Sequence, residues 1–160
     1  MESSVVTRAA TRADMSAIGT LAAMLVQLHH DYDPLRFMAA TAGTAHGYGS
    51  YLGTQLQEAN VVVLVAEVAG VVIGYSYAGI EGIDYMALRG PAGALYDIMV
   101  DPARRGHGVG AQLLDATLAA LTTLGAPRVV LSTAEQNASA QRLFARAGFR
   151  RTMVEMTREA

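Results

Sequence analysis

A strand that runs directly into a glycine-rich loop and then into a helix is the feature that most constrains this 160-residue chain. Residues 94–100 (ALYDIMV) have an apolar strand pattern, and the loop DPARRGHGVG follows without a break. Leucines then recur at helical spacing over residues 111–124, and Gly125 and Pro127 end the predicted helix. A strand–loop–helix unit followed by another strand pattern is typical of an α/β domain.

Hydrophobic periodicity predicts the other elements. TRAD, at residues 11–14, has the spacing of a capping box at the start of a helix. Two apolar runs on either side of Ala69 and Gly70 indicate a hairpin. The expected elements are strands at 4–10, 61–65, 71–80, 128–133 and 149–157, and helices after residue 14, at 48–59 and at 137–147. No repeat or linker interrupts this order, so residues 1–160 are interpreted as a single domain.

Composition excludes several classes of protein. The chain has no cysteine, which excludes disulfides and thiolate chemistry. Its formal net charge of −2 gives no general attraction to nucleic acid or to an anionic membrane surface. No apolar run reaches the ~20 residues that a membrane-spanning helix needs, and the first residues lack a signal-peptide pattern. We therefore expect a cytoplasmic protein with neither a nucleic-acid nor a membrane partner.

The glycine loop is suited to binding an anion. The first amides of a helix lack partners within the helix, and the helix dipole adds roughly half a positive charge there. Gly106, Gly108 and Gly110 let a bulky anion approach the backbone, and Arg104 and Arg105 add positive charge. A phosphate or pyrophosphate is the ligand that this arrangement favours. The alternative is a turn that needs glycine only for tight packing.

Two phosphate-binding motifs can be compared with this loop. The chain lacks the lysine-containing loop of nucleoside triphosphatases. GHGVGA loosely satisfies the dinucleotide fingerprint, and Glu135 lies near the expected distance for a ribose-binding acid. That fold places its loop after the first strand and continues with several parallel strands, whereas this loop comes late in the chain. A dinucleotide-binding protein is therefore the weaker alternative.

The loop matches a different pattern more closely. In this pattern an arginine or glutamine is followed three positions later by glycine and five positions later by glycine or alanine. Arg105, Gly108 and Gly110 satisfy it. About thirty residues later the chain reads NASAQRLFARAGF. Together these motifs closely resemble the GNAT N-acetyltransferase superfamily, and the resemblance covers most of the chain. It implies a mixed, splayed β-sheet with helices on both faces.

The resemblance also implies a cosubstrate, acetyl-CoA, and the residues that bind it. The loop amides hold the pyrophosphate, and the strand before the loop pairs its backbone with the pantetheine arm. Asn137 matches an asparagine that contacts the cosubstrate, although asparagine is also a good helix cap. The implied binding residues are Ile98, Met99, Val100, Arg105, Gly106, His107, Gly108, Val109, Gly110, Ala111 and Asn137.

The implied reaction is acetyl transfer to a primary amine by direct attack on the thioester. A general base is expected because a lysine-type amine has a pKa near ~10.4. Asp97 interrupts an apolar strand and is the candidate base or amine anchor, or else a structural partner of an amide or arginine. The amide of Val100 is the candidate for stabilising the carbonyl oxygen. Many relatives have a tyrosine that protonates the thiolate, but Phe144 stands there, so no acid is assigned.

Candidates for binding the amine acceptor come from two segments. Tyr32 follows the first predicted helix, where relatives often place an acceptor-binding loop, and Glu81 and Asp84 lie before the strand that carries Asp97. Tyrosines elsewhere, Tyr48 and Tyr75 among them, could join this site or could only pack in the core.

No metal site is expected. His29 and His30 are adjacent, and their side chains point about 100° apart on a helix.

Three points stay open at this stage. The acceptor could be a small molecule, a protein lysine or a protein N-terminus. A non-catalytic acyl-CoA-binding module is the alternative to an enzyme, because Phe144 could reflect lost chemistry. A homodimer is expected only from the resemblance.

Overall fold

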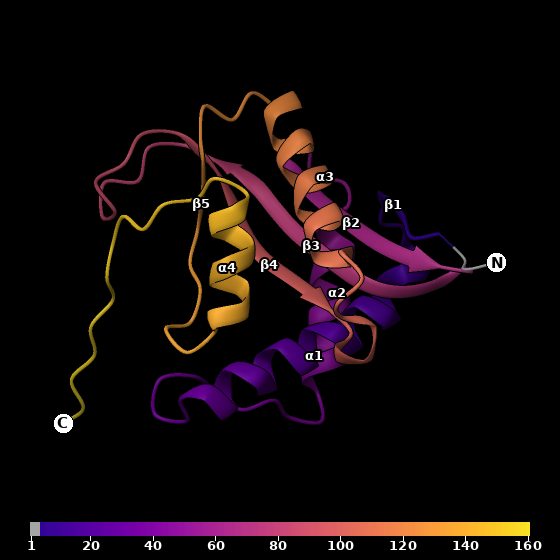
Figure 1. Ribbon diagram of the computed structural model, residues 1–160, viewed down its shortest axis with the longest axis horizontal. Coiled ribbons are helices and arrows are strands. Elements are labelled where there is room, and N and C mark those ends of the chain that lie inside the picture. Colours follow the sequence, from indigo (N-terminus) through magenta and orange to yellow (C-terminus); the bar gives the residue numbers. More distant parts are fainter. Residues whose placement is uncertain (1–3) are drawn as a thin grey trace.

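The computed structural model describes residues 4–160. Its five strands form one sheet in the order β1-β2-β3-β4-β5 (Figure 1). All neighbouring strands are antiparallel except β4 and β5, which are parallel. The strands are β1 (Val6–Ala9), β2 (Val61–Val68), β3 (Val71–Glu81), β4 (Ala92–Val100) and β5 (Val129–Leu131). With a single parallel pair, this sheet is not the doubly wound parallel sheet that the dinucleotide-binding alternative requires.

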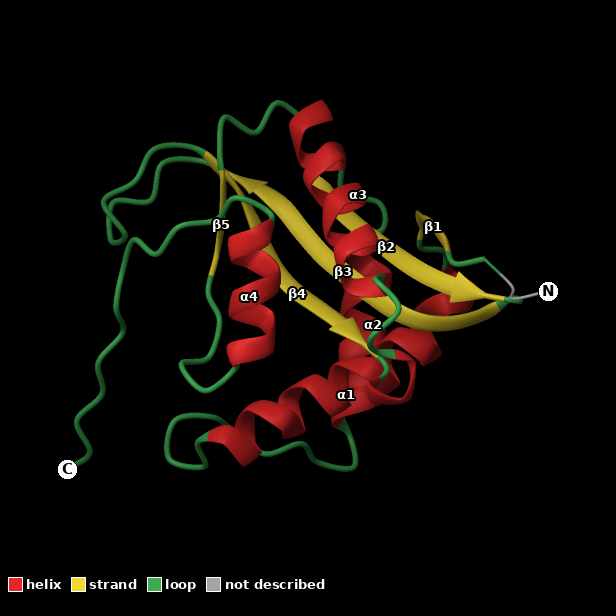
Figure 2. Cartoon of the chain, viewed as in Figure 1, coloured by secondary structure: helices red, strands yellow, loops and turns green. Residues whose placement is uncertain are grey.

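Helices cover both faces of the sheet (Figure 2). The helices are α1 (Met15–Tyr32), α2 (Thr44–Gln55), α3 (Val109–Thr123) and α4 (Ala138–Arg146), with short 3-10 turns η1 (Arg12–Asp14) and η2 (Pro102–Arg104). On one face Val63 and Val65 of β2 pack in a core with residues of α1 and α2. On the other face the neighbouring Val62 packs with Leu114 of α3 and Phe144 of α4. Because alternate side chains of β2 are buried on opposite faces, the unbroken apolar run of this strand is explained.

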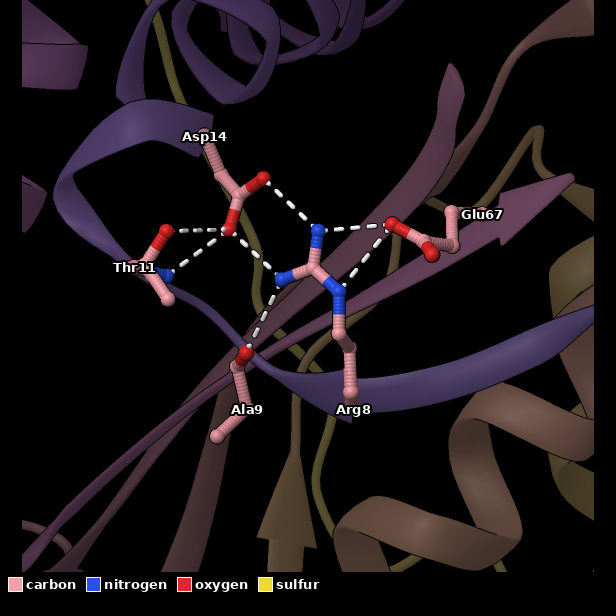
Figure 3. A network of polar contacts seen from close by, with 5 residues as sticks. All are labelled: Arg8, Ala9, Thr11, Asp14 and Glu67. Atoms are coloured by element: carbon pink, nitrogen blue, oxygen red, sulfur yellow. Dashed lines mark hydrogen bonds and ion pairs between the residues drawn. The ribbon is translucent and has the colours of Figure 1, made fainter. Parts of the chain in front are cut away.

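The capping box predicted at residues 11–14 is confirmed and belongs to a larger polar cluster (Figure 3). The amide of Thr11 donates to Asp14 Oδ2 at 2.8 Å. The guanidinium of Arg8 in β1 donates to both oxygens of Asp14, at 2.8 and 3.0 Å, and to Glu67 of β2 at 2.6 Å. These bonds fix the first turn of α1 against β1 and β2. The Arg8 hydrogen bonds lower the pKa of Asp14 to about 2.

The second helix differs from its prediction and shows why glycine-rich sequence can be helical. It was expected at 48–59, yet α2 spans Thr44–Gln55 and includes part of the glycine-rich segment. A Cβ on Gly19 of α1 would lie 2.2 Å from the carbonyl oxygen of Ala45, and one on Gly49 would lie 2.6 Å from that of Met15. Glycine is needed because the two helix backbones touch. Close helix packing therefore overrides the low helix propensity of glycine.

The final strand predicted at 149–157 is wrong. No strand follows α4, and residues 150–160 run as an extended segment away from the body of the protein (Figure 1). Most of its side chains are exposed, with Met153 at 73% and Met156 at 89%. The apolar pattern of the segment has no surface of its own chain to cover, and the short β5 does not pair with it. A strand pattern needs a partner strand as well as the right residues.

Candidate active site

The loop after β4 holds two glycines in the left-handed backbone region. Gly106 has φ of +88° and Gly108 has φ of +73°, which residues with side chains rarely adopt. A Cβ placed on either glycine meets no atom within 4 Å, and one on Gly110 makes only ordinary contact with Leu143 at 3.5 Å. Packing within the chain therefore does not require these glycines. The backbone path requires the first two, and open space lies above them.

Helix α3 begins directly from this loop. Gly108 is its cap and Val109 its first residue, two positions earlier than predicted, so Ala111 is the third helical residue. The Val109 side chain is buried against the sheet and anchors the turn, whereas Gly106, His107 and Gly108 are exposed. The first amides of the helix have no partners inside it and carry the positive end of its dipole. The loop thus offers an accessible backbone site for an anion.

Arg105 reinforces the junction between strand and loop. Its Nε donates to the carbonyl oxygen of Val100 at 3.3 Å, and its Nη2 lies 3.7 Å from Met99 Sδ. The guanidinium is therefore folded back along the end of β4. From this position it holds the loop in place and adds positive charge beside it.

The edge of β4 that faces β5 is open over its last residues. The two strands pair at three positions only, ending at Leu95 and Leu131, and then diverge (Figure 2). A β-bulge between β3 and β4 contributes to this divergence. Tyr77 pairs with Asp97 and Ala78 with Leu95, so Tyr96 is an extra residue of β4. The expected splayed sheet is thereby confirmed.

The open edge of β4 presents backbone amides near the glycine loop. The amide of Asp101 donates to the carbonyl oxygen of Ile73 in β3 at 2.8 Å. Because amides alternate in direction along a strand, those of Ile98 and Val100 point away from β3, toward the open edge. Ile98, Met99 and Val100 thus form the stretch of strand that leads into the loop.

A cavity of about 260 Å³ lies where β4 and β5 separate. One half is formed by the two strands and α4, through Ile98, Ser132, Thr133, Asn137, Ala140 and Phe144. The other half is formed by α1, α2 and the segment between them, with Tyr96 and Asp97 of β4 at the junction. Segments far apart in the sequence therefore line one small, partly open cavity at the middle of β4.

Asn137 and Phe144 lie on the α4 side of this cavity. Asn137 caps α4, since its Oδ1 accepts from the amide of Ala140 at 3.1 Å, and it also lines the cavity. The two roles considered for Asn137 are therefore compatible. Phe144 is 6% exposed and packs edge-on against Phe149, at 5.9 Å between ring centroids. It contributes an apolar wall and no proton.

Asp97 is the most unusual group of the cavity. The hydroxyl of Tyr75, a fully buried residue, donates to Asp97 Oδ2 at 3.1 Å. Burial raises the pKa of Asp97, and hydrogen bonds from Tyr48 and Tyr75, together with the charge of nearby His29, act in the opposite direction. The carboxyl is therefore hydrogen-bonded to tyrosines and has no arginine or lysine partner among the described residues. Such a group retains the ability to take a proton or to bind an ammonium ion.

The acceptor candidates Tyr32, Glu81 and Asp84 do not line this cavity. Glu81 forms an ion pair with Arg89 and accepts from the Tyr96 hydroxyl at 2.7 Å, and these bonds lower its pKa. Asp84 accepts two backbone amides of its own loop, at 3.0 Å each. Tyr32 ends α1, its ring 6.1 Å from that of His29. A role of these residues in acceptor binding stays a prediction.

Several residues of the cavity were missed or only loosely indicated by the sequence. Leu25 and His29 lie one helical turn apart on α1 and line it together, whereas Phe37 and Met38 come from the segment after α1. The spacing of Leu25 and His29 continues the apolar stripe of α1 and could have indicated them. Nothing in the local sequence indicates Phe37 or Met38, since their position depends on how the chain returns between α1 and α2.

Within residues 4–160, no group of three or more His, Asp or Glu side chains is placed to hold a metal ion. None of the described helices combines the length and the apolar character that crossing a membrane requires.

Known structures share this architecture at low sequence identity. A mutant of the BH1408 protein from Bacillus halodurans matches with a TM-score of 0.80 and 20% identity, over 97% of this chain and 99% of that one. Aminoglycoside N-acetyltransferase AAC(6')-Iy in complex with CoA matches with a TM-score of 0.74 and 21% identity, over 100% and 97% of the two chains. The same enzyme in complex with the bisubstrate analogue CoA-S-monomethyl-acetylneamine gives 0.70 and 22%, over 99% of each chain. At these identities the likeness establishes the fold.

Sequence comparison establishes the family. Mycothiol acetyltransferase from Thermobispora bispora is 38% identical over 96 residues, which are 58% of this chain and 31% of that protein. The matched region thus spans less than a third of this relative. A sequence profile of the Acetyltransferase (GNAT) family matches residues 24–149, which include the cavity, the open edge of β4, the glycine loop and α4. The chain belongs to the GNAT family of acetyltransferases.

Proposed function

We propose that this chain transfers the acetyl group of acetyl-CoA to a primary amine by direct attack of the amine on the thioester. The observation that carries the proposal is the order of features along β4. A partly buried carboxyl, Asp97, is followed by the open edge at Ile98, Met99 and Val100, and then by the glycine loop. An acid, an extended backbone edge and an anion site in this order suit an amine, a pantetheine arm and a pyrophosphate.

In this proposal the backbone of the loop and first helical turn binds the pyrophosphate. The residues are Arg105, Gly106, His107, Gly108, Val109, Gly110 and Ala111. The left-handed turns at Gly106 and Gly108 support it, because they expose amides without side chains above them. Along the open edge formed by Ile98, Met99 and Val100, the amide of Val100 donates to the pantetheine arm, and Asn137 closes the opposite side of the cavity.

Asp97 binds the ammonium group and removes its proton. An amine attacks only as the neutral base. Because its pKa lies near ~10.4, it is mostly protonated at neutral pH and must lose a proton before it can react. Burial raises the pKa of Asp97 and makes it a stronger base than an exposed aspartate. The nitrogen then bonds to the carbonyl carbon, the C–S bond breaks, and the thiolate leaves. Because the thioester lies between the amine at Asp97 and the pantetheine arm, the outward-facing amide of the adjacent Ile98, and not that of Val100, is placed to donate to the carbonyl oxygen as it gains negative charge.

No side chain is assigned as the acid for the leaving group. Phe144 has no proton to give, and a thiol with a pKa near ~8.5 is a tolerable leaving group that can take a proton from water.

A thiol-release assay with acetyl-CoA and primary amines tests this function, with the acetylated amine identified by mass spectrometry. We expect Asp97→Asn to lower kcat about 100-fold while coenzyme A affinity is retained. Asp115→Asn on the exposed side of α3 is the matched control and should leave kcat unchanged. Full activity of Asp97→Asn across the pH range would remove Asp97 from the mechanism. Coenzyme A binding without thiol release from any amine would instead favour a non-catalytic acyl-CoA-binding module.

A further inference from the structure

The half of the cavity formed by α1, α2 and the segment between them restricts the amine that can enter. Resting on the acetyl transfer proposed above, we infer that the acceptor is a small primary monoamine with an apolar body, and that polyamines and other polycations are poor acceptors. The argument rests on the number of carboxylates, the character of the walls and the size of the cavity.

The cavity offers the acceptor one carboxylate. Of the described residues that line the cavity, Asp97 alone carries a carboxylate. The acids on adjoining segments already have partners: Glu81 binds Arg89, and Glu155 binds Arg36. Asp31 accepts from the side-chain amide of Gln27 at 2.8 Å, and Asp33 accepts the amides of the residues that follow it. One ammonium group can therefore be neutralised inside the cavity, and a second charged amine would be desolvated without a partner.

The basic side chains near this half of the cavity are already engaged. The guanidinium of Arg36 lies 4.7 Å from the centre of the Phe37 ring, and Phe37 lines the cavity. His29 lines it from α1, with its Nδ1 hydrogen-bonded to the carbonyl oxygen of Leu25 at 2.8 Å. Neither group offers a negative charge to a second ammonium group.

The walls of this half suit an apolar body. They are formed by Leu25, Val26, Phe37 and Met38 together with the rings of Tyr48 and Tyr96. The Phe37 and His29 rings pack edge to face at 5.1 Å, which stiffens the wall opposite Asp97. Aromatic and aliphatic side chains of this kind pack well against flat or branched hydrocarbon.

The size of the cavity sets an upper limit on the acceptor. Pockets that enclose a drug-sized ligand have volumes of roughly 300–1,000 Å³. This cavity holds about 260 Å³, part of which the acetyl thioester must occupy. The remaining space admits a ring or a short branched chain beside the reacting nitrogen. An oligosaccharide with several amines would have to extend beyond the cavity into solvent.

A pair of amines that differ by one charge tests the inference. We expect hexylamine to be acetylated with a kcat/KM about tenfold or more above that of 1,6-diaminohexane, and 2-phenylethylamine to be accepted as well. Met38→Glu places a second carboxylate at the exposed rim of the cavity. It should lower the ratio of kcat/KM for hexylamine to kcat/KM for 1,6-diaminohexane. Met38→Gln, of nearly the same shape without the charge, should leave the ratio unchanged.

The outcomes separate the two proposals. A diamine acetylated as well as or better than the monoamine overturns the inference about the acceptor and leaves acetyl transfer intact. Equal shifts of the ratio in Met38→Glu and Met38→Gln overturn the role of charge at this rim. Thiol release with neither amine but with a polyamine or an aminoglycoside overturns the inference about the acceptor alone, whereas binding of acetyl-CoA without thiol release from any amine overturns both proposals.

Discussion

The buried hydroxyl of Tyr75 donates a hydrogen bond to Asp97 across neighbouring strands of the sheet. This bond favours the ionised carboxyl, whereas burial favours the protonated one and raises the pKa of Asp97. Tyr75 does not line the cavity, so it acts on the reaction only through Asp97. It is therefore a positioning residue.

Replacing Tyr75 by phenylalanine should move the pH dependence of catalysis. Loss of the donor raises the pKa of Asp97 further, so the acidic limb of kcat/KM should shift to higher pH with the same amine. Coenzyme A affinity should not change. Tyr85→Phe, at a residue 75% exposed on the loop before β4, is the control. An acidic limb that stays in place would show that Asp97 is not the group that titrates.

The contact between α1 and α2 predicts opposite effects of two alanine substitutions. Gly19→Ala drives a Cβ against the Ala45 carbonyl oxygen and should lower the free energy of unfolding by about 3 kcal/mol. Because α2 carries Tyr48 into the cavity, turnover should fall too. Gly47→Ala on the same helix places its Cβ in open space and should add about 1 kcal/mol. Denaturant unfolding measures both, and equal effects would contradict the close packing of the two backbones.

The cluster around Arg8 predicts a loss of stability in acid. The pKa of Asp14 is lowered to about 2 in the folded protein from an ordinary value near ~3.9. A depressed carboxyl pKa contributes stability above the unfolded value, and this contribution, about 2 kcal/mol, is lost as pH falls from about 4 toward 2.

Arg8→Met should remove at least this amount at pH 7, and the difference from the parent protein should shrink as pH falls through the same window. Arg12→Met, at an exposed neighbouring arginine, is the control and should behave as the parent does. A difference that stays constant with pH would show that Arg8 acts through packing and not through the charge of Asp14.

Local signals in the sequence were enough to predict the part of the site that is built from one segment. The strand 94–100, the glycine loop and the helix after it are adjacent in the chain. Their conformations follow from residues within a few positions, such as Gly108 at the left-handed cap of α3. The asparagine cap of α4 was predicted for the same reason. The elements expected here are confirmed, with shifts at their ends.

Features that depend on distant partners were not predictable. The helical state of the glycine-rich segment in α2 depends on contact with Gly19 of α1, about thirty residues away. The predicted strand at 149–157 is not formed, because the pattern is present without a partner strand. Phe37 and Met38 reach the cavity only because α1 and α2 are held together. Asp97 was identified from its local pattern, but its hydrogen bond to Tyr75 required the register of β3 with β4.

Binding of acetyl-CoA at the glycine loop is the central claim, and a pair of glycines allows a matched test. Gly108 has φ of +73° and Gly70, in the turn between β2 and β3, has φ of +79°, and a Cβ on either meets no atom within 4 Å. Valine at either position therefore introduces a similar backbone strain, on the order of 1–3 kcal/mol. Only valine at Gly108 places a side chain where the anion is proposed to bind.

The most direct measurement is a thermal-shift titration of the parent, Gly108→Val and Gly70→Val proteins with acetyl-CoA, coenzyme A and NAD. A ligand that binds only the folded state raises Tm with its concentration. We predict that both coenzyme A species raise Tm of the parent and of Gly70→Val, that Gly108→Val loses this response, and that NAD has no effect. Stabilisation by NAD alone, or an equal response of Gly108→Val and Gly70→Val to acetyl-CoA, would contradict the account.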